Sequence, residues 1–350
     1  GDIESLPFLE AIRQMRIELG PSQTYFIHLT LVPYLGTAGE LKTKPTQHST
    51  KELRSIGIQP DMLICRSEKR VPESARHKIA LFSNLSPLSV VSLPDVDNIY
   101  QIPLTLFEQK VDIRIIEALH LQTTTPNLSE WDNILNKQKH DNGSVTIGVI
   151  GKYTELTDAY KSVSEALTHA GIHTRIHVNI RYIEAESVPT NADEWHLFFK
   201  NIDAILVPGG FGSRGIEGKI LAAQYAREQK IPYLGICLGM QTAVIEFARH
   251  KALLKEAHSS ECDSKTPYPV IALVKEWENQ EGHKVTRHHA SPVGGTMRLG
   301  NQHCHLMKDS HIAQIYDGTN IIERHRHRYE VNPMWVPDLE KAGLYITGTS

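Results

Sequence analysis

Apolar residues along the chain recur with two alternating periods, one helical and one strand-like. Residues 5–19 carry apolar side chains at spacings of three and four, which predicts an amphipathic helix with Ser5 as its N-cap. The elements predicted next are a strand at 25–32, short strands at 62–65 and 89–93, and a helix at 73–82. Strands that alternate with helices indicate a parallel sheet with crossover helices.

A second pattern of the same kind follows a polar connection. Residues 122–143 are rich in Gln, Thr, Asn and Lys, so we interpret them as a linker. Beyond them the pattern predicts strands at 145–151, 173–180, 204–207 and 231–236, and helices at 158–170, 216–229 and 238–249. The sequence therefore predicts two α/β domains with parallel sheets, at residues 1–121 and 144–350.

Composition narrows the class of protein. The 350 residues include 37 Lys and Arg and 40 Asp and Glu. The chain therefore lacks the excess of basic residues that is typical of a nucleic-acid-binding protein. No apolar run reaches the ~20 residues that cross a bilayer. The four cysteines form no C-x-x-C pair, which argues against a disulfide framework or a zinc site and fits a reducing compartment. We expect a cytoplasmic protein without a nucleic acid or a membrane as partner.

Cys237 lies where an apolar strand runs directly into a helix, with Gly235 and Gly239 two positions to either side. This is the spacing of a nucleophile elbow, with Cys in place of Ser, and the strained turn needs small neighbours. The helix N-terminus is expected to lower the pKa of the thiol. The alternative is a buried core cysteine, but the two glycines and the strand–helix junction favour a nucleophile.

Two glycines, Gly209 and Gly210, end the preceding predicted strand. Their backbone N–H groups could hold an oxyanion, although an ordinary turn after a strand would also use glycine. A cysteine nucleophile needs a base as well, and the spacing of the 19 histidines singles out none of them. We interpret the alternating His/Arg run at 324–328 as a strand with a basic solvated face. Residues 211–218 are either a mobile lid or an ordinary exposed loop.

A basic, hydroxyl-rich loop at 42–47 precedes a helix predicted at 47–56. Its two lysines and two threonines suit the oxygens of a phosphate group, and the alternative is a solvated loop. The chain has no G-x-x-x-x-G-K-[ST] phosphate-binding motif.

Taken together, these motifs are similar to those of a known family. The segments 209–212 and 235–241 resemble a class I glutamine amidotransferase domain. The segments 1–5, 42–47, 294–300 and 323–332 then narrow the resemblance to the CTP synthase family. It implies an α/β fold in which a truncated P-loop-type amidoligase domain (1–121) and a linker (122–143) precede a flavodoxin-like amidotransferase domain (144–350).

The resemblance also implies an activity. Family members are ATP-dependent ligases that aminate UTP to CTP with ammonia from L-glutamine. The cofactors implied are ATP and Mg²⁺, with GTP as an allosteric activator and CTP as an inhibitor. The assembly implied is a homotetramer, with filaments as a further form.

Site residues carry over position by position. Cys237 matches the nucleophile that forms a glutamyl thioester. The glutamine-binding positions are matched by Gly210, Leu238, Gly239, Met240, Gln241, Glu261 and Arg328. The UTP/CTP positions are matched by Asp2, Ile3, Glu4, Lys42, Thr43, Lys44, Pro45, Thr46, Gln47 and Lys78. A stretch beside the ATP adenine is matched by Pro94, Asp95 and Val96.

Some parts of the family pattern have no counterpart here. We expect the phosphate loop and the Mg²⁺ ligands upstream of Gly1, and the catalytic His and Glu downstream of Ser350. On that expectation these residues alone bind nucleotide without turnover. The alternative function is an amidotransferase or cysteine hydrolase coupled to a different acceptor, in which residues 42–47 would have no role.

Overall fold

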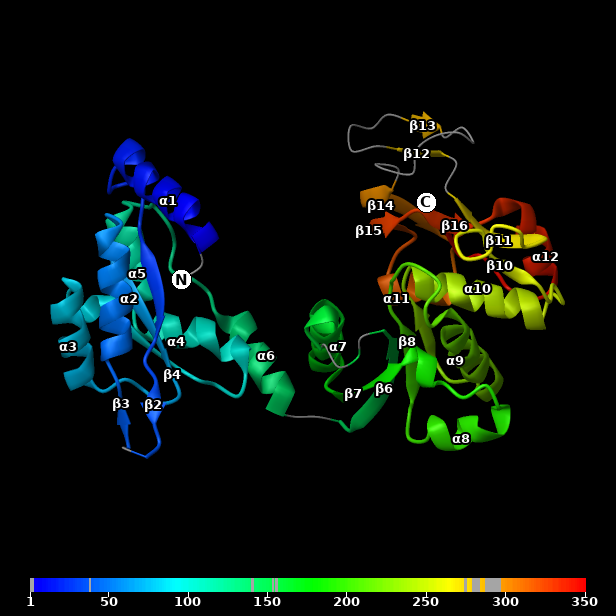
Figure 1. The fold of residues 1–350 in the computed structure, drawn as a ribbon, viewed down its shortest axis with the longest axis horizontal. Coiled ribbons are helices and arrows are strands. Elements are labelled where there is room, and N and C mark those ends of the chain that lie inside the picture. The colour runs from blue at the N-terminus through cyan, green and yellow to red at the C-terminus, as the bar shows by residue number, and fades with distance from the viewer. Residues whose placement is uncertain are drawn as a thin grey trace. The chain divides into compact units, whose positions relative to one another are not determined.

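A computed structural model describes residues 3–37, 39–139, 142–152, 154, 157–273, 276–278, 284–286 and 297–350. The chain divides into two compact units, Gly1–His140 and Asp141–Ser350 (Figure 1). Each unit has its own apolar core and is described by itself below. No helix in the described part is long and apolar enough to cross a membrane.

Unit 1 is built on a parallel sheet with strand order β1-β4-β5, formed by β1 (Ile27–Leu31), β4 (Met62–Ser67) and β5 (Val90–Pro94). The central strand β4 is buried at four of its six positions, because elements cover both faces of the sheet. The crossover helices α2 (Lys44–Ser55) and α3 (Glu73–Ser83) contact each other. The remaining elements are η1 (Ile3–Ser5), α1 (Leu6–Leu19), the hairpin β2 (Tyr34–Leu35) and β3 (Glu40–Leu41), η2 (Pro87–Ser89), η3 (Ile99–Gln101), α4 (Ile102–Glu108), α5 (Val111–Ala118) and α6 (Ser129–Lys139).

Three details of unit 1 differ from the sequence prediction. Ser5 occupies the N-cap position of α1, but it has helical backbone angles and makes no capping hydrogen bond, so the predicted cap is wrong. Helix α2 begins at Lys44 rather than at residue 47, since Thr43 is its N-cap residue. The segment interpreted as a linker contains α6, whose Trp131 ring lies 6.4 Å from that of Tyr100.

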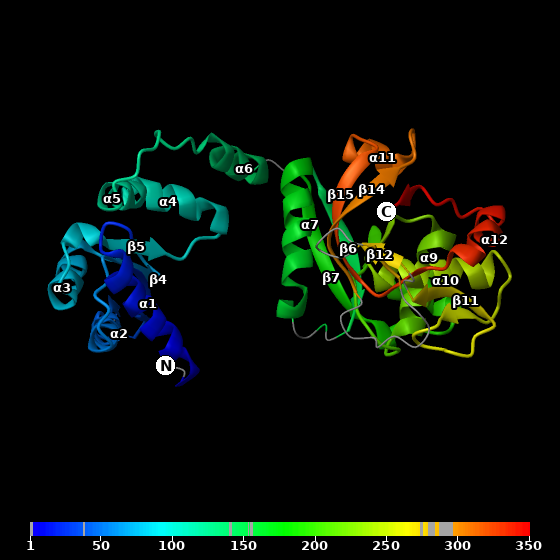
Figure 2. The same cartoon turned by 90° about the horizontal axis from the view of Figure 1, so that it is seen from above.

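Unit 2 is built on a parallel sheet with strand order β7-β6-β8-β9. Its strands are β6 (Ser144–Gly151), β7 (His177–Glu184), β8 (Ala204–Val207) and β9 (Tyr233–Gly235). Its helices are α7 (Lys161–Thr174), which packs on β7 (Figure 2), α8 (Trp195–Phe198), α9 (Ile216–Gln229) and α10 (Leu238–His250). Open sheets of this order bind ligands at the carboxyl ends of their strands.

Smaller sheets follow in the second half of unit 2. Strands β10 (Ala257–Ser259), β11 (Tyr268–Leu273) and β16 (Tyr329–Val331) form one sheet, and β12 (Glu276–Glu278) pairs with β13 (Lys284–Thr286). Strands β14 (Arg298–Leu306), β15 (Asn320–His327) and β17 (Gly348–Thr349) form an antiparallel sheet. The other elements are η4 (Thr157–Tyr160), η5 (Ala185–Ser187), η6 (Ala192–Glu194), α11 (His311–Tyr316), η7 (Pro333–Trp335) and α12 (Val336–Lys341).

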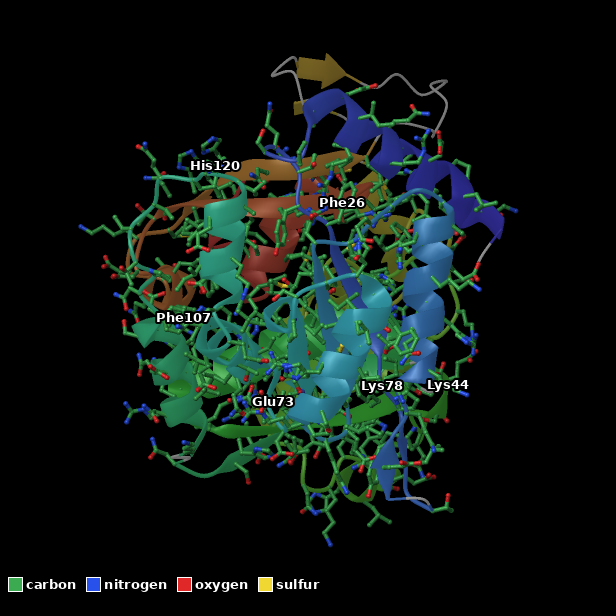
Figure 3. All side chains as sticks on the ribbon, turned by 90° about the vertical axis from the view of Figure 1, so that its left-hand side faces the viewer. Phe26, Lys44, Glu73, Lys78, Phe107 and His120 are labelled. Carbon is green, nitrogen blue, oxygen red and sulfur yellow. The ribbon has the colours of Figure 1, made fainter. Side chains whose placement is uncertain are left out.

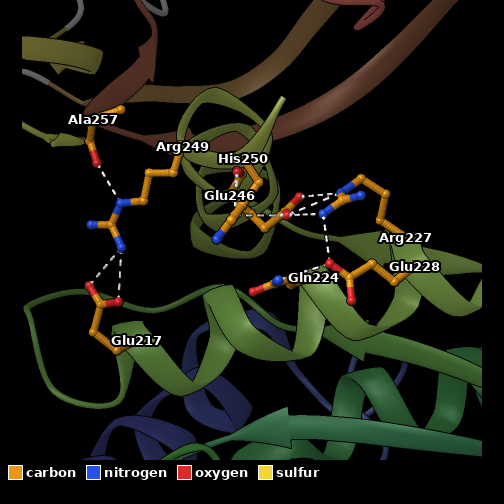
Figure 4. A network of polar contacts seen from close by, with 8 residues as sticks. All are labelled: Glu217, Gln224, Arg227, Glu228, Glu246, Arg249, His250 and Ala257. Atoms are coloured by element: carbon orange, nitrogen blue, oxygen red, sulfur yellow. Dashed lines mark hydrogen bonds and ion pairs between the residues drawn. The ribbon is translucent and has the colours of Figure 1, made fainter. Parts of the chain in front are cut away.

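Two ion pairs of different burial join helix α9 to helix α10 (Figure 4). Arg227 donates from Nε and Nη2 to both carboxylate oxygens of Glu246 at 2.7–3.1 Å, and the Glu246 side chain is only 3% exposed. Arg249 donates from Nη1 to Glu217 at 2.9 Å, but the Glu217 side chain is 63% exposed. Solvent screens the second pair and hardly reaches the Glu246 carboxylate.

We therefore expect Glu246→Ala to lower the free energy of unfolding by about 2 kcal/mol, because it leaves a partly buried guanidinium with only the more exposed Glu228 carboxylate as its partner. The matched change Glu217→Ala removes a carboxylate that is equally close to its arginine but is exposed to solvent. We expect it to lower the free energy of unfolding by less than about 0.5 kcal/mol. Urea unfolding of the two variants measures the difference. Equal losses would contradict this assignment of the stabilising pair.

Candidate active site

The backbone of Cys237 adopts the strained conformation that the sequence predicts. Cys237 follows β9, is the N-cap residue of α10, and has φ 53° and ψ −107°. A Cβ on Gly235 would lie 2.4 Å from the carbonyl carbon of Gly239, and a Cβ on Gly239 would lie 2.0 Å from the carbonyl oxygen of Val207. Because no side chain fits at those distances, only glycine is compatible with this turn. The predicted elbow geometry is confirmed.

The two glycines after β8 lie beside the sulfur. A Cβ on Gly209 would be 3.4 Å from Cβ of Cys237, so the two backbones are in contact distance. The backbone N–H groups of Leu238 and Gly210 both donate to the Cys237 sulfur. Two amides from separate strand ends, converging on one atom, can stabilise negative charge that develops there or on a bound carbonyl. The expected neighbourhood of residues 209–210 and Cys237 is therefore present.

The electrostatics of the thiol differ from the sequence prediction. Burial raises the pKa of Cys237, and the two N–H groups and the Lys219 ammonium act against it. The predicted net lowering is therefore wrong, because the desolvation of a thiolate here outweighs the hydrogen bonds at the helix N-terminus. A thiol in this state needs a base to become a nucleophile.

A cavity of about 610 Å³ opens in front of Cys237. One wall contains Gly209, Gly210, Phe211, Ile236, Cys237, Met240 and Gln241, and the other contains residues 323–327, Tyr329 and Glu330. The second wall is β15 and its continuation, held by a hydrogen bond from Gln241 Nε2 to the Tyr329 carbonyl at 3.0 Å. The Cys237 thiol itself points to the Arg326 carbonyl at 3.8 Å. The volume suits a small molecule such as an amino acid.

Strand β15 contains the alternating His/Arg run. The predicted strand is confirmed, but the run also lines the cavity rather than presenting only a solvated face. His325 Nδ1 and His327 Nε2 are 2.9 Å apart, and the Cys304 sulfur lies 3.6 Å from His325 Nε2. Burial, together with the positive charge of His325 and Arg298, lowers the pKa of His327 to about 4, so this ring is neutral near pH 7. The interaction of Cys237 with this strand is made by the Arg326 carbonyl rather than by an imidazole.

The predicted glutamine-binding residues are partly assembled around this cavity. Gly210, Met240 and Gln241 line it with Cys237. Leu238 and Gly239 are buried directly after Cys237, in the first turn of α10. Glu261 accepts a hydrogen bond from the Gly212 N–H at 3.4 Å and acts electrostatically on Cys237. The guanidinium of Arg328 has its Nε buried without a hydrogen-bond partner. Glu261 and Arg328 are outside the cavity lining as described.

The residues predicted to bind nucleotide lie in unit 1. Residues 44–47 form the first turn of α2, although the sequence predicted a loop at 42–47. Within this turn Thr46 is fully buried and donates a hydrogen bond to the Leu31 carbonyl, whereas Lys44 is exposed. Lys44 and Lys78 project from the neighbouring helices α2 and α3 (Figure 3). Lys42 hydrogen-bonds to Glu40, and both Lys42 and Lys78 lower the pKa of that carboxyl, Lys42 the more strongly. Three lysines are thus grouped near one end of α2.

The remaining predicted nucleotide positions are less informative. Asp2 lies outside the described residues, and Ile3 and Glu4 form part of η1. Pro94 ends β5, and Asp95 pairs with Arg66 at 3.0 Å just before Val96. The part of the chain that the structure describes contains no group of three or more His, Cys, Asp or Glu side chains that could hold a metal ion.

Sequence reasoning missed two features of the site. The first is Lys219 on α9, a fully buried cation that acts electrostatically on Cys237. Helix α9 begins at Ile216, so it also includes residues 216–218 of the segment predicted to be a lid or an exposed loop. The second feature is β15 as a wall of the cavity. The alternation in the His/Arg run predicted a strand, but no local signal indicated which element that strand would cover.

Comparison with known proteins identifies a matching family for each unit. Residues 155–350, more than half of the chain, match the family model for glutamine amidotransferase class-I. Unit 2 is therefore a class I amidotransferase fold, as its strand order and nucleophile elbow indicate. Residues 1–121 match the model for the CTP synthase N-terminus.

A solved structure of the Trypanosoma brucei CTPS glutaminase domain with bound acivicin is similar to this chain at 38% identity and a TM-score of 0.51. The match covers 58% of this chain and 74% of that one. The chain belongs to the CTP synthase family. Its members are glutamine-dependent C–N ligases that aminate UTP to CTP, using ATP and Mg²⁺. The predicted fold class and family are confirmed.

Proposed function

We propose that unit 2 performs the glutaminase half of CTP synthesis, with Cys237 as the nucleophile. The observation that carries this proposal is the position of its sulfur on a strained elbow, facing the N–H groups of Gly210 and Leu238 at the edge of a cavity. A buried core cysteine would have neither the left-handed backbone nor the cavity.

The geometry supports a thioester mechanism. A general base takes the thiol proton, and the Cys237 sulfur attacks the carboxamide carbon of glutamine. The carbonyl oxygen becomes an oxyanion that the N–H groups of Gly210 and Leu238 can hold. Collapse of this intermediate breaks the C–N bond, and the nitrogen takes a proton and leaves as ammonia. Water then hydrolyses the thioester, which releases glutamate and restores the thiol.

Recognition of glutamine is assigned to the residues that match the glutamine-binding positions of the family. The carboxylate of Glu261 suits the α-ammonium group, and the guanidinium of Arg328 suits the α-carboxylate. Gly210, Leu238, Gly239, Met240 and Gln241 supply the backbone and side-chain surface between them. The buried, unpartnered Nε of Arg328 supports this role, because such a donor favours an anionic ligand.

In unit 1 we propose that residues 42–47 and Lys78 bind the phosphates of UTP, the acceptor, and of the inhibitor CTP, with Asp2, Ile3 and Glu4. The grouping of Lys42, Lys44 and Lys78 supports this proposal. Pro94, Asp95 and Val96 are assigned to ATP. Since the described residues offer no cluster that fits a metal ion, no step is assigned to Mg²⁺ here. Activation by GTP, a cytoplasmic location and assembly as a tetramer or filament complete the proposal.

Covalent labelling tests the assignment of the nucleophile. The full-length protein is incubated with a diazoketone analogue of L-glutamine, and labelled peptides are identified by mass spectrometry. We expect one label per chain, on Cys237, with protection by L-glutamine and not by D-glutamine. Labelling of a different cysteine, or labelling of Cys237 that L-glutamine does not prevent, would refute the proposal.

A further inference from the structure

Helix α9 buries a lysine that its packing does not require. Lys219 is 1% exposed and ranks among the largest fully buried side chains of the described residues. Its neighbours on the same face of the helix include Ile216 and Ala222, which belong to the apolar cores. An ammonium group in such surroundings is costly unless it is paired. No carboxylate oxygen of the described residues lies within 4.0 Å of Lys219 Nζ. No ion pair among these residues therefore offsets the desolvation of the ammonium.

The Lys219 ammonium lies against the loop that faces the nucleophile. A Cβ on Gly210 would be 3.8 Å from Lys219 Nζ and 3.5 Å from Cδ2 of Leu238. Gly210 and Leu238 are the two residues whose N–H groups donate to the Cys237 sulfur. Lys219 Nζ is therefore close to Gly210, one of the two residues of the oxyanion site, and Lys219 is not among the residues that line the cavity.

The other charged groups that act on Lys219 already have partners. Lys152 donates from Nζ to the Phe211 carbonyl at 3.0 Å, and Glu184 accepts from Thr154 and Arg214. Cys237 is the remaining titratable group in this set, and the attraction between a thiolate and the Lys219 ammonium favours the charged form of each. The buried Lys219 ammonium, which has no ion-pair partner among the described residues, is thus close to the Cys237 thiol, which must become negatively charged in the reaction.

We propose that Lys219 is a positioning residue of the glutaminase reaction, whose buried ammonium stabilises the negative charge that develops at the Cys237 sulfur and at the oxyanion beside Gly210. This inference rests on the assignment of Cys237 as the nucleophile. A buried cation that interacts with a thiolate offsets part of the desolvation that disfavours the thiolate.

The proposal has a consequence for pH. Burial, reinforced by Lys152, lowers the pKa of Lys219 to about 8, while Glu184 and Cys237 act in the opposite direction. The ammonium is therefore present at pH 7 and is lost as the pH rises through about 8. Its contribution to thiolate formation is largest at neutral pH, where most thiols are still protonated.

The test compares Lys219→Met with Lys219→Arg and with Lys230→Met, an exposed lysine at the end of the same helix, in the full-length protein. Iodoacetamide alkylation is followed cysteine by cysteine across the neutral and alkaline pH range. We expect Lys219→Met to alkylate Cys237 about tenfold more slowly at pH 7, and this difference from the wild type to shrink as the pH rises through about 8, where the Lys219 ammonium is lost. Cys262 and Cys304 are internal references and keep their rates. Lys219→Arg and Lys230→Met are expected to follow the wild type.

Thermal unfolding separates this role from a structural one. Because the change removes an unpaired buried charge, Lys219→Met is expected to melt at the same temperature as the wild type or higher. Lys219→Gln is measured as a second neutral variant. An unchanged Cys237 rate in both neutral variants, or a lowered melting temperature in both, would overturn the proposal. If the glutamine analogue did not label Cys237 of the wild type, the assignment of Cys237 as the nucleophile would fail instead. The experiments therefore distinguish a failure of that assignment from a failure of the proposal for Lys219.

Discussion

Cys237→Ala is expected to reduce glutamine-dependent CTP formation by about three orders of magnitude or more, while CTP formation from added ammonia stays at the wild-type rate. The reason is that the thioester needs the Cys237 sulfur, whereas the amination of UTP uses ammonia from either source. Alanine occupies less volume and adds no charge, so the elbow and the paired amides of Gly210 and Leu238 remain. The measurement is CTP production in the full-length protein with ATP, UTP and either nitrogen source.

Cys304→Ala is the matched control, because Cys304 is also half-buried and near β15 but has no role in the proposed reaction. It should leave both nitrogen sources effective. Loss of ammonia-dependent synthesis in Cys237→Ala would mean that the change disturbs more than glutamine hydrolysis. Retention of glutamine-dependent synthesis would mean that another group attacks glutamine.

The elbow could be predicted from the sequence because its signal, a strand that runs into a helix through Gly-x-Cys-x-Gly, is local along the chain. Gly235 and Gly239 are glycine because their Cα atoms approach backbone within this turn and at the end of β8. The alternation of strands and helices likewise predicted β6 to β9 and α7, α9 and α10, since a buried parallel strand and an amphipathic helix each have a local pattern.

The rest of the site depends on long-range packing. Strand β15 reaches Cys237 from 89 positions further along the chain, and no local pattern specifies that approach. The direction of the Cys237 pKa shift was wrong for a related reason: a helix N-terminus is visible in the sequence, but the burial that outweighs it is not. Lys219 was missed because a single lysine in a helix is normally solvent-exposed, and its burial is a property of the folded unit.

The cap at Ser5 shows the same limit on a smaller scale. A serine before an amphipathic helix is a good N-cap candidate, but here the chain is already helical through η1. Its backbone therefore lacks the extended conformation that a capping side chain needs.

Gly239→Ala is expected to destabilise unit 2 by about 3 kcal/mol or more and to abolish the labelling of Cys237 by a glutamine analogue. The new Cβ would lie 2.0 Å from the carbonyl oxygen and 2.8 Å from the carbonyl carbon of Val207. These are backbone atoms at the end of β8, so the clash is relieved only if α10 moves away from the sheet. That movement would also separate the N–H of Leu238 from the loop that contains Gly210. Urea unfolding and analogue labelling measure the two effects.

Gly318→Ala is the matched control in the same unit. Its nearest atom to a new Cβ is the Tyr316 carbonyl oxygen at 4.0 Å, and its φ lies outside the left-handed region, so we expect a change within about 0.5 kcal/mol. If Gly239→Ala unfolded like the wild type and still labelled Cys237, β8 and α10 would not be in the contact described here. The oxyanion site would then need a different geometry, because the same close approach brings Gly210 and Leu238 to one sulfur atom.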